Sequence, residues 1–165
     1  MSTELSAVKV GLAIVLFGLF FNIGLGISFG VNEDAYKDYV AQGVAAHPDV
    51  HDEASQDKIW RYALRTHFHA GGIAAFCLGL LILATISDLS QGLKKVAATL
   101  IGLGSLYPLA WLSMFVLAPS IGRDPAHDHI LTMLLTFVGV GGLVIGSLIL
   151  VGNLFLGLFK DRASA

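Results

Sequence analysis

The chain has 165 residues, of which 55% are hydrophobic and 13% are charged, and its mean hydropathy is +0.75. This composition excludes an ordinary water-soluble domain and indicates a small integral membrane protein with a single domain. The formal net charge of −2 gives no indication of a nucleic-acid partner, and one cysteine, Cys77, excludes both a disulfide framework and a thiolate metal site.

Four stretches are long and apolar enough to cross a bilayer, which requires about 20 residues. They are residues 8–30, 62–86, 96–117 and 130–159. The sequence therefore predicts an all-α, polytopic protein with a bundle of four transmembrane helices, placed in the bacterial cytoplasmic membrane. Pro108 lies inside the third stretch and is expected to kink it, because proline removes one helical hydrogen bond.

The basic residues next to the spans suggest an orientation. Five of them lie on the side that the two termini share: Lys9, Lys94, Lys95, Lys160 and Arg162. The positive-inside rule then predicts that both termini are cytoplasmic. Three arginines on the other side, Arg61, Arg65 and Arg123, oppose this assignment.

The segment 31–59 between the first two spans is polar and mostly acidic, which predicts an outer loop. Residues 35–46 could form a short amphipathic helix at the membrane interface. Apolar anchors should hold the loop over the end of the bundle: Tyr36, Tyr39, Val40, Val44 and Trp60. His47 and His51 are separated by Pro48, which breaks helical spacing, and are expected in a solvated part of this loop.

Two similar histidine patterns open the second and fourth spans. They read Thr66-His67-Phe68-His69 and Ala126-His127-Asp128-His129, and a Lys-Val pair begins both the first and the third span. These repeats favour two duplicated helical hairpins, which would place both histidine pairs at one depth on facing helices. The alternative is that apolar helices resemble one another by composition alone.

On a regular helix, His67 and His69 point about 200° apart and cannot chelate one ion together. Beside His67 the helix is nearly bare of bulk, at Ala70, Gly71 and Ala74. Such a flank leaves room for a porphyrin or, alternatively, for close helix packing. Arg61 and Arg65 lie further outward and could bind haem propionates. Their other expected roles are binding lipid phosphate or pairing with Asp124 or Asp128.

The fourth helix is expected to begin at Asp124 and Pro125, an acidic cap followed by a first-turn proline. His129 then shares an inward face with Thr132. Asp128 could fix a histidine tautomer by a hydrogen bond, or act as a helix N-terminal acid. The pairing expected on these grounds is His67 or His69 with His129, around one centre between the second and fourth helices.

The tripeptide His67-Phe68-His69 resembles the haem-ligating histidine pair of the haem–copper oxidases. In that family the two histidines hold two haems on opposite sides of one helix, so the resemblance implies haem ligation by His67 and His69. It covers these three residues only. The copper-binding histidine cluster and the twelve-helix core of the oxidases are absent from this chain.

Three functions follow from these patterns. The first is a b-type haem protein in quinol-linked membrane electron transfer, an oxidoreductase component with axial ligands among His67, His69, His127 and His129. The second is a copper, zinc or iron site built from the same histidines with Asp128, in a metal-handling protein or oxygenase subunit. The third is a structural subunit of a larger membrane complex or a homo-oligomer, in which glycine pairs at 26 and 30 and at 142 and 146 allow close helix contacts. The sequence displays no complete catalytic set.

Overall fold

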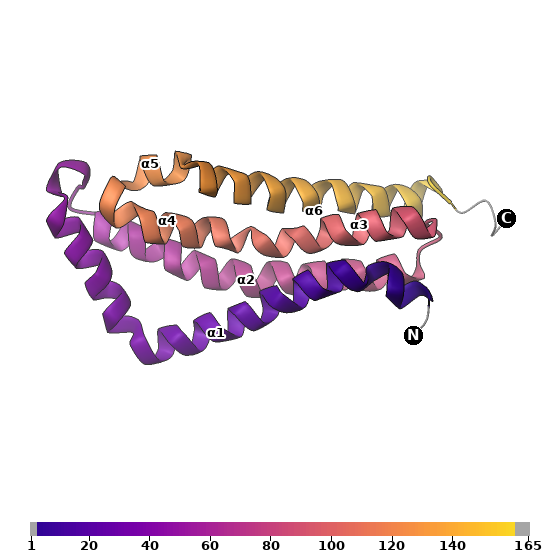
Figure 1. The fold of residues 1–165 in the computed structure, drawn as a ribbon, viewed down its shortest axis with the longest axis horizontal. Helices are drawn as coiled ribbons and strands as arrows, with labels where there is room; N and C mark the ends of the chain where they lie inside the picture. Colours follow the sequence, from indigo (N-terminus) through magenta and orange to yellow (C-terminus); the bar gives the residue numbers. More distant parts are fainter. Residues whose placement is uncertain (1–2, 161–165) are drawn as a thin grey trace.

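The computed structural model describes residues 3–160, which fold almost entirely into helices (Figure 1). In chain order the elements are α1 (Thr3–Ala46), the 3-10 turn η1 (Pro48–Val50), α2 (Ser55–Ile86), α3 (Gln91–Leu103), the 3-10 turn η2 (Gly104–Leu106), α4 (Pro108–Ile121), α5 (Arg123–Asp128) and α6 (Ile130–Leu156). Four helical stretches are long and apolar enough to span a membrane: Glu4–Ala46, Ser55–Ile86, Gln91–Ile121 and Ile130–Leu156. The predicted all-α bundle of four membrane-spanning helices is confirmed.

The bundle has two ends of different character. The N- and C-terminal parts of the chain lie together at one end, as the two marks in Figure 1 show. The opposite end, called the loop end below, is formed by residues 47–54 and 122–129. Of the described basic residues, Lys9, Lys94, Lys95 and Lys160 belong to the terminal end, whereas Lys37, Lys58, Arg61, Arg65 and Arg123 belong to the half with the loop end. The basic residues therefore give the terminal end no excess that would orient the chain.

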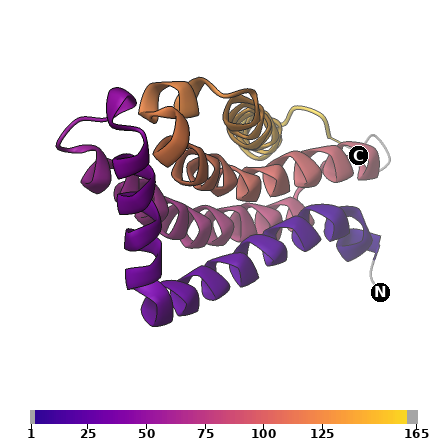
Figure 2. The ribbon, with the colours of Figure 1, turned by 60° about the vertical axis from the view of Figure 1, so that its left-hand side comes forward.

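Helix α1 corrects the predicted outer loop. It does not stop near residue 30 but continues to Ala46 past a kink at Asn32, where φ is −127° and ψ is 25°. Beyond the kink the helix crosses the end of the bundle, as Figure 2 shows. The helix expected over residues 35–46 is therefore confirmed, its acidic residues are exposed, and the loop is confined to residues 47–54.

The apolar anchors of this segment pack as predicted. Val40 is buried in a cluster at the loop end, with Ile59, Ala63, Phe115, Ala118 and Ala126. Tyr36, Val44 and Trp60 pack against the cluster, and the Tyr39 hydroxyl donates a hydrogen bond to the Val116 carbonyl (2.7 Å). The segment is therefore held across the end of the bundle, as the sequence predicts.

The third span is interrupted. Helix α3 ends at Leu103, and the 3-10 turn η2 joins it to α4, which begins at Pro108. Proline fits this first helical position because its missing N–H would have no helical acceptor there. The predicted disturbance at Pro108 is confirmed.

Glycines set the closest helix contacts. A Cβ at Gly146 of α6 would lie 2.8 Å from the Ala97 carbonyl oxygen, and one at Gly142 would lie 2.9 Å from that of Leu100. This glycine pair therefore makes a close helix contact within the chain, between α6 and α3. Of the other pair, Gly26 contacts a histidine ring, while Gly30 has nothing within 4 Å.

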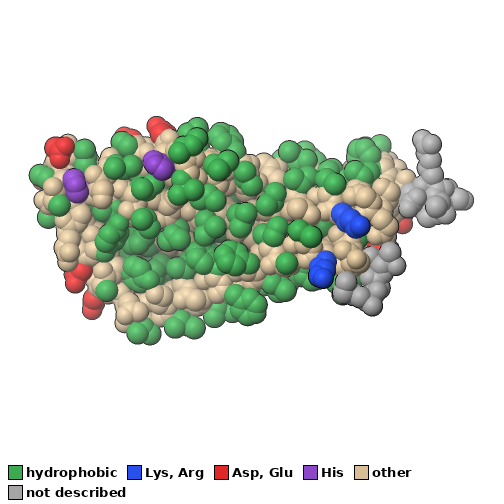
Figure 3. All heavy atoms as spheres, viewed as in Figure 1, with side chains coloured by type: hydrophobic (Ala, Val, Ile, Leu, Met, Phe, Trp, Pro, Cys, Tyr) green, Lys and Arg blue, Asp and Glu red, His purple; other side chains and the backbone are tan. Residues whose placement is uncertain are grey.

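The outside of the bundle is apolar. Phe20, Phe137 and Phe155 have exposed fractions of 70%, 69% and 78%. Figure 3 shows hydrophobic side chains over most of the face that it draws, with histidines toward the loop end. Large apolar side chains on the surface of a helical bundle are expected where lipid is the solvent.

Candidate functional site

His67 and His69 lie near the middle of α2 and face different helices. The His67 ring packs against α1, where its centroid is 6.2 Å from that of Phe29. The His69 ring packs against α4, with centroids 5.7 Å from Tyr107 and 5.6 Å from Trp111. The opposite directions follow from the 3.6-residue turn of the helix, as predicted.

The hydrogen bonding of His69 leaves one ring nitrogen available. Its Nδ1 lies 2.9 Å from the carbonyl oxygen of Arg65, one turn earlier in α2. A carbonyl can only accept, so Nδ1 carries the hydrogen and Nε2 keeps its lone pair. Within residues 3–160, Nε2 makes no hydrogen bond. Histidines that bind metals commonly have this arrangement, in which the second nitrogen is held by a carbonyl or carboxylate.

His67 is enclosed by α1 instead. A Cβ at Gly26 would lie 3.0 Å from its Cε1 atom, so the ring rests directly on the backbone of α1. Its Nδ1 is buried without a hydrogen-bond partner. One turn away, a Cβ at Gly71 would lie 2.9 Å from Nδ2 of Asn22. The small-residue flank is therefore used for helix packing, which is the alternative to porphyrin space that the sequence leaves open.

His127 and Asp128 form the hydrogen bond that the sequence suggests. Nδ1 of His127 lies 2.9 Å from Oδ1 of Asp128, and the two side chains are 72% and 77% exposed. Asp128 is the last residue of α5 and does not lie in the first turn of α6. Its role as the partner of a histidine is therefore the one that the structure shows.

His129 caps a helix. The backbone N–H of Leu131 donates to its Nδ1 (3.3 Å), and His129 is the N-cap of α6. The predicted start of the fourth helix at Asp124 is wrong, because Asp124 and Pro125 belong to the separate short helix α5. A neutral ring whose Nδ1 accepts carries its hydrogen on Nε2, so neither nitrogen of His129 is left free to bind a metal.

The two histidine pairs lie at different depths. The His69 ring contacts Tyr107, and a Cβ at Gly139 of α6 would lie 2.9 Å from Cα of the same tyrosine. Gly139 follows His129 by ten residues, or about 15 Å along a helix. The common depth predicted from duplication is therefore not found, and no hydrogen bond, ion pair or ring contact within residues 3–160 joins the two pairs.

A metal site of several side chains is not formed in the described part of the chain. Among residues 3–160, no group of three or more His, Cys, Asp or Glu side chains could hold a metal ion. The four sequence-predicted histidines and Asp128 are thus spread over α2, α5 and the start of α6. Within this set, the structure brings together only the adjacent pair His127 and Asp128.

Arg61 and Arg65 belong to a basic pocket. The guanidinium carbon of Arg65 lies 4.8 Å from the centre of the Trp111 ring. The pocket has a volume of about 130 Å³ and is lined by Lys58, Arg61, Tyr62, Arg65 and Arg123. The ion pairs considered with Asp124 or Asp128 are absent among the described residues; Asp52 instead pairs with Lys58 (3.2 Å) and Arg123 (3.5 Å).

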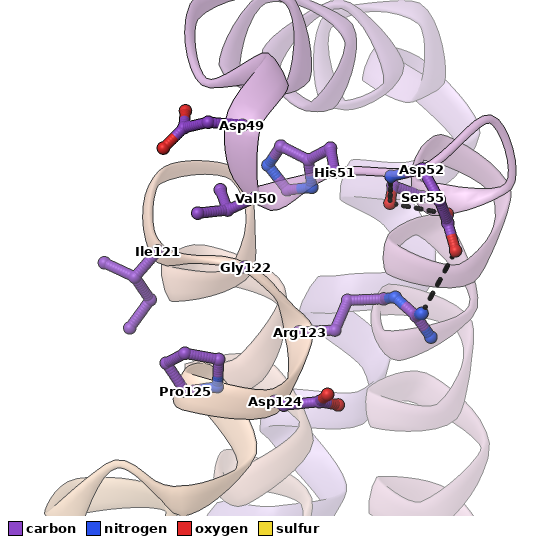
Figure 4. A pocket seen from close by; sticks show the side chains of 10 residues that line it. All are labelled: Asp49, Val50, His51, Asp52, Ser55, Ile121, Gly122, Arg123, Asp124 and Pro125. Atoms are coloured by element: carbon purple, nitrogen blue, oxygen red, sulfur yellow. Dashed lines mark hydrogen bonds and ion pairs between the residues drawn. The ribbon is translucent and has the colours of Figure 1, made fainter.

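A second pocket, of about 300 Å³, lies at the loop end where residues 49–55 meet the turn between α4 and α5 (Figure 4). His51 Nε2 lies 3.0 Å from the Pro119 carbonyl oxygen and therefore donates to it, while Nδ1 is buried without a partner. His51 lies in the loop as predicted, but its ring nitrogens are bonded or buried and are not solvated. Its neighbours come from α4, so nothing local in the sequence indicates this contact.

Asp52 at this pocket gives a pH-dependent prediction. Hydrogen bonds from Ser55 and then Lys58 hold the pKa of its carboxyl below the usual 3.8. A carboxyl whose pKa is lowered by folding stabilises the fold above its unfolded pKa, and this contribution is lost as the pH falls through the lower folded value. We expect the melting temperature in detergent to fall below pH 3.8 less steeply for Asp52→Asn than for the unchanged protein. The control is Asp38→Asn, at an exposed carboxylate of α1, which should leave the fall of the melting temperature with pH as steep as in the unchanged protein. If Asp52→Asn also gave a fall as steep as that of the unchanged protein, the prediction would be contradicted.

Comparisons with protein families, with curated proteins and with solved structures return no match to this chain.

Proposed function

We propose that this protein is an integral membrane electron-transfer component that holds a b-type haem through Nε2 of His69. The observation that supports this function best is the hydrogen bond of His69 Nδ1 to the Arg65 carbonyl, because it presents Nε2 with a free lone pair. His69 is the one histidine of the two sequence pairs that combines such a nitrogen with a position on a membrane-spanning helix and partial exposure.

The surroundings of His69 are aromatic and partly open to the outside of the bundle. Tyr107 and Trp111 present aromatic surfaces beside the imidazole, and the ring is only partly covered by protein. His67 fits less well, because α1 occupies the space beside it. A porphyrin is therefore proposed at the partly exposed side of His69, facing the bilayer or a second subunit.

When bound, haem would supply one-electron chemistry at a potential set by its ligands and surroundings. The chain's own part is to orient the ligand nitrogen and to keep water away from it with apolar side chains. A quinol dissolved in the bilayer is the donor class that could reach a group at this surface. A second protein ligand would have to come from another subunit, a second copy included, because His129 lies about 15 Å along α6 from the level of His69.

The proposed setting is the bacterial cytoplasmic membrane with both termini in the cytoplasm. Lysines within α1 and α3 and just after α6 support this orientation, and the arginines at the loop end oppose it. A C-terminal alkaline phosphatase fusion should be inactive and a C-terminal green fluorescent protein fusion should fluoresce. The reverse result would invert the orientation.

The absorption spectrum of the protein purified from membranes tests the function. We expect a Soret band that sharpens and shifts on reduction with dithionite, together with an α band, and haem in an amount close to that of the chain. Expression with a haem precursor supplied removes underloading as a cause of a weak signal. A protein without chromophore under these conditions would refute haem binding and would favour the structural-subunit function.

A further inference from the structure

The basic pocket near the loop end has more positive charge than the chain neutralises. Lys58, Arg61, Arg65 and Arg123 all line it, and Asp52 is the one carboxylate that forms an ion pair with any of them among the described residues. Arg61 forms no ion pair or hydrogen bond within residues 3–160. Four cations that face one small space repel one another unless an anion lies between them.

The four side chains are arranged by two elements. Lys58, Arg61 and Arg65 follow one another at spacings of three and four on α2, which places them on one helix face. Tyr62 lies four residues after Lys58 and three before Arg65, on the same face. Arg123 comes from the first residue of α5. Arg65 is held over the Trp111 ring by a cation–π contact of 4.8 Å, and Tyr62 contacts the same ring at 5.8 Å. The pocket is thus assembled by the fold.

The depth of the basic pocket in the bundle indicates that it lies at the edge of the hydrocarbon layer. Ser113 of α4 bonds to Thr132 of α6 (2.7 Å), and Trp111 lies on the inner side of Ser113. On α6, Ile130 and Leu131 are 74% and 47% exposed although they lie further outward than Thr132. Arg65 therefore reaches a level at which neighbouring side chains still face lipid tails, where an unpaired charge is costly.

The aromatic residues place an interface at the same level. All four tyrosines and both tryptophans of the chain lie in the half of the bundle with the loop end: Tyr36, Tyr39, Tyr62, Tyr107, Trp60 and Trp111. Tyrosine and tryptophan are enriched where the membrane meets water, next to the lipid headgroups. The basic pocket is therefore positioned where lipid phosphate groups are found.

We propose that this pocket binds the phosphate of an anionic phospholipid. Guanidinium groups match phosphate oxygens in a two-pronged geometry, and Lys58 adds a mobile third donor. The tails of such a lipid would lie along the exposed apolar surface of α4 and α6. This site does not depend on haem, since it requires neither a free histidine nitrogen nor a chromophore.

Lipid retention tests the proposal. The full-length protein is purified in detergent, exchanged into mixed micelles that contain phosphatidylglycerol or phosphatidylcholine, and analysed by native mass spectrometry. We expect phosphatidylglycerol to remain bound in preference to phosphatidylcholine. Changing Arg61 and Arg65 together to glutamine should lower this retention at least about tenfold, because two charge-assisted contacts are lost.

The control removes two cations from the other end of the bundle. Lys9→Gln with Lys95→Gln should leave retention within about twofold of the unchanged protein, as neither lysine is near the pocket. Arg61→Gln alone tests the site without risk to the fold, since Arg61 has no partner in the described chain, and it should also lower retention. Equal retention by the arginine and lysine variants would overturn the proposal. Displacement of the lipid by millimolar inorganic phosphate would overturn it too, in favour of a free-phosphate site.

Discussion

Replacing Gly11 by alanine is expected to lower the free energy of unfolding by at least about 2 kcal/mol, because the new methyl group would overlap backbone atoms. An ideal Cβ at Gly11 would lie 2.0 Å from the carbonyl oxygen of Ala98, and a Cβ at Gly102 would lie 2.7 Å from Cα of Gly11. Helices α1 and α3 touch backbone to backbone here, and no side chain can rotate away. The helices would have to separate, which would also loosen the fully buried Ala97 and Ala98.

The matched control is Gly24→Ala in the same helix. Nothing lies within 4 Å of a Cβ at Gly24, so the methyl group meets open space. Alanine also suits a helix better than glycine, which favours this variant by up to about 1 kcal/mol. Thermal unfolding in detergent should therefore separate the two variants, with Gly11→Ala melting lower and Gly24→Ala at or above the unchanged protein. Equal melting temperatures would show that α1 and α3 do not touch as closely as the structure has them.

The membrane-spanning part of the fold was predictable because its signal is local. A run of about 20 apolar residues has few alternatives to a transmembrane helix. The helix over residues 35–46 was predicted, but its continuity with the first span through Asn32 was not, since the polar residues after position 30 read as the start of a loop. Its helix is stabilised by contacts from elsewhere in the chain, such as Tyr39 with Val116. Sequence periodicity around Tyr36, Val40 and Val44, at intervals of four, was the signal that could have extended the helix.

The candidate site was predictable in part for a similar reason. The opposite directions of His67 and His69 follow from helix geometry alone. The depth of His129 depends on where α6 begins and on how α6 is staggered against α3. Those features are set by the cap at His129 and by the contacts of Gly142 and Gly146, which are known only from the folded chain. The depth of His129 could therefore not be predicted by counting residues from the start of each span.

Changing His69 to alanine is expected to abolish the proposed chromophore, whereas changing His129 to asparagine should leave it in place. The reason is the different use of the two rings. His69 uses Nδ1 to bind the Arg65 carbonyl and keeps Nε2 free, while His129 uses Nδ1 to cap α6. Asparagine is a good N-cap, so His129→Asn preserves the helix start and tests the histidine's ligand role alone.

The measurement is the ratio of Soret to protein absorbance for each variant, purified in parallel. The melting temperature of each variant shows whether its fold is kept. If His69→Ala folds normally but loses the Soret band, and His129→Asn keeps the band, His69 is supported as the ligand. If His129→Asn loses the Soret band and His69→Ala keeps it, the ligand would be His129 at the loop end. Helix α6 would then have to begin at a different residue. His67→Ala adds a further check. Because its ring is packed against Gly26, that variant should cost stability through the cavity left at the α1–α2 contact while the spectrum of the remaining haem is unchanged.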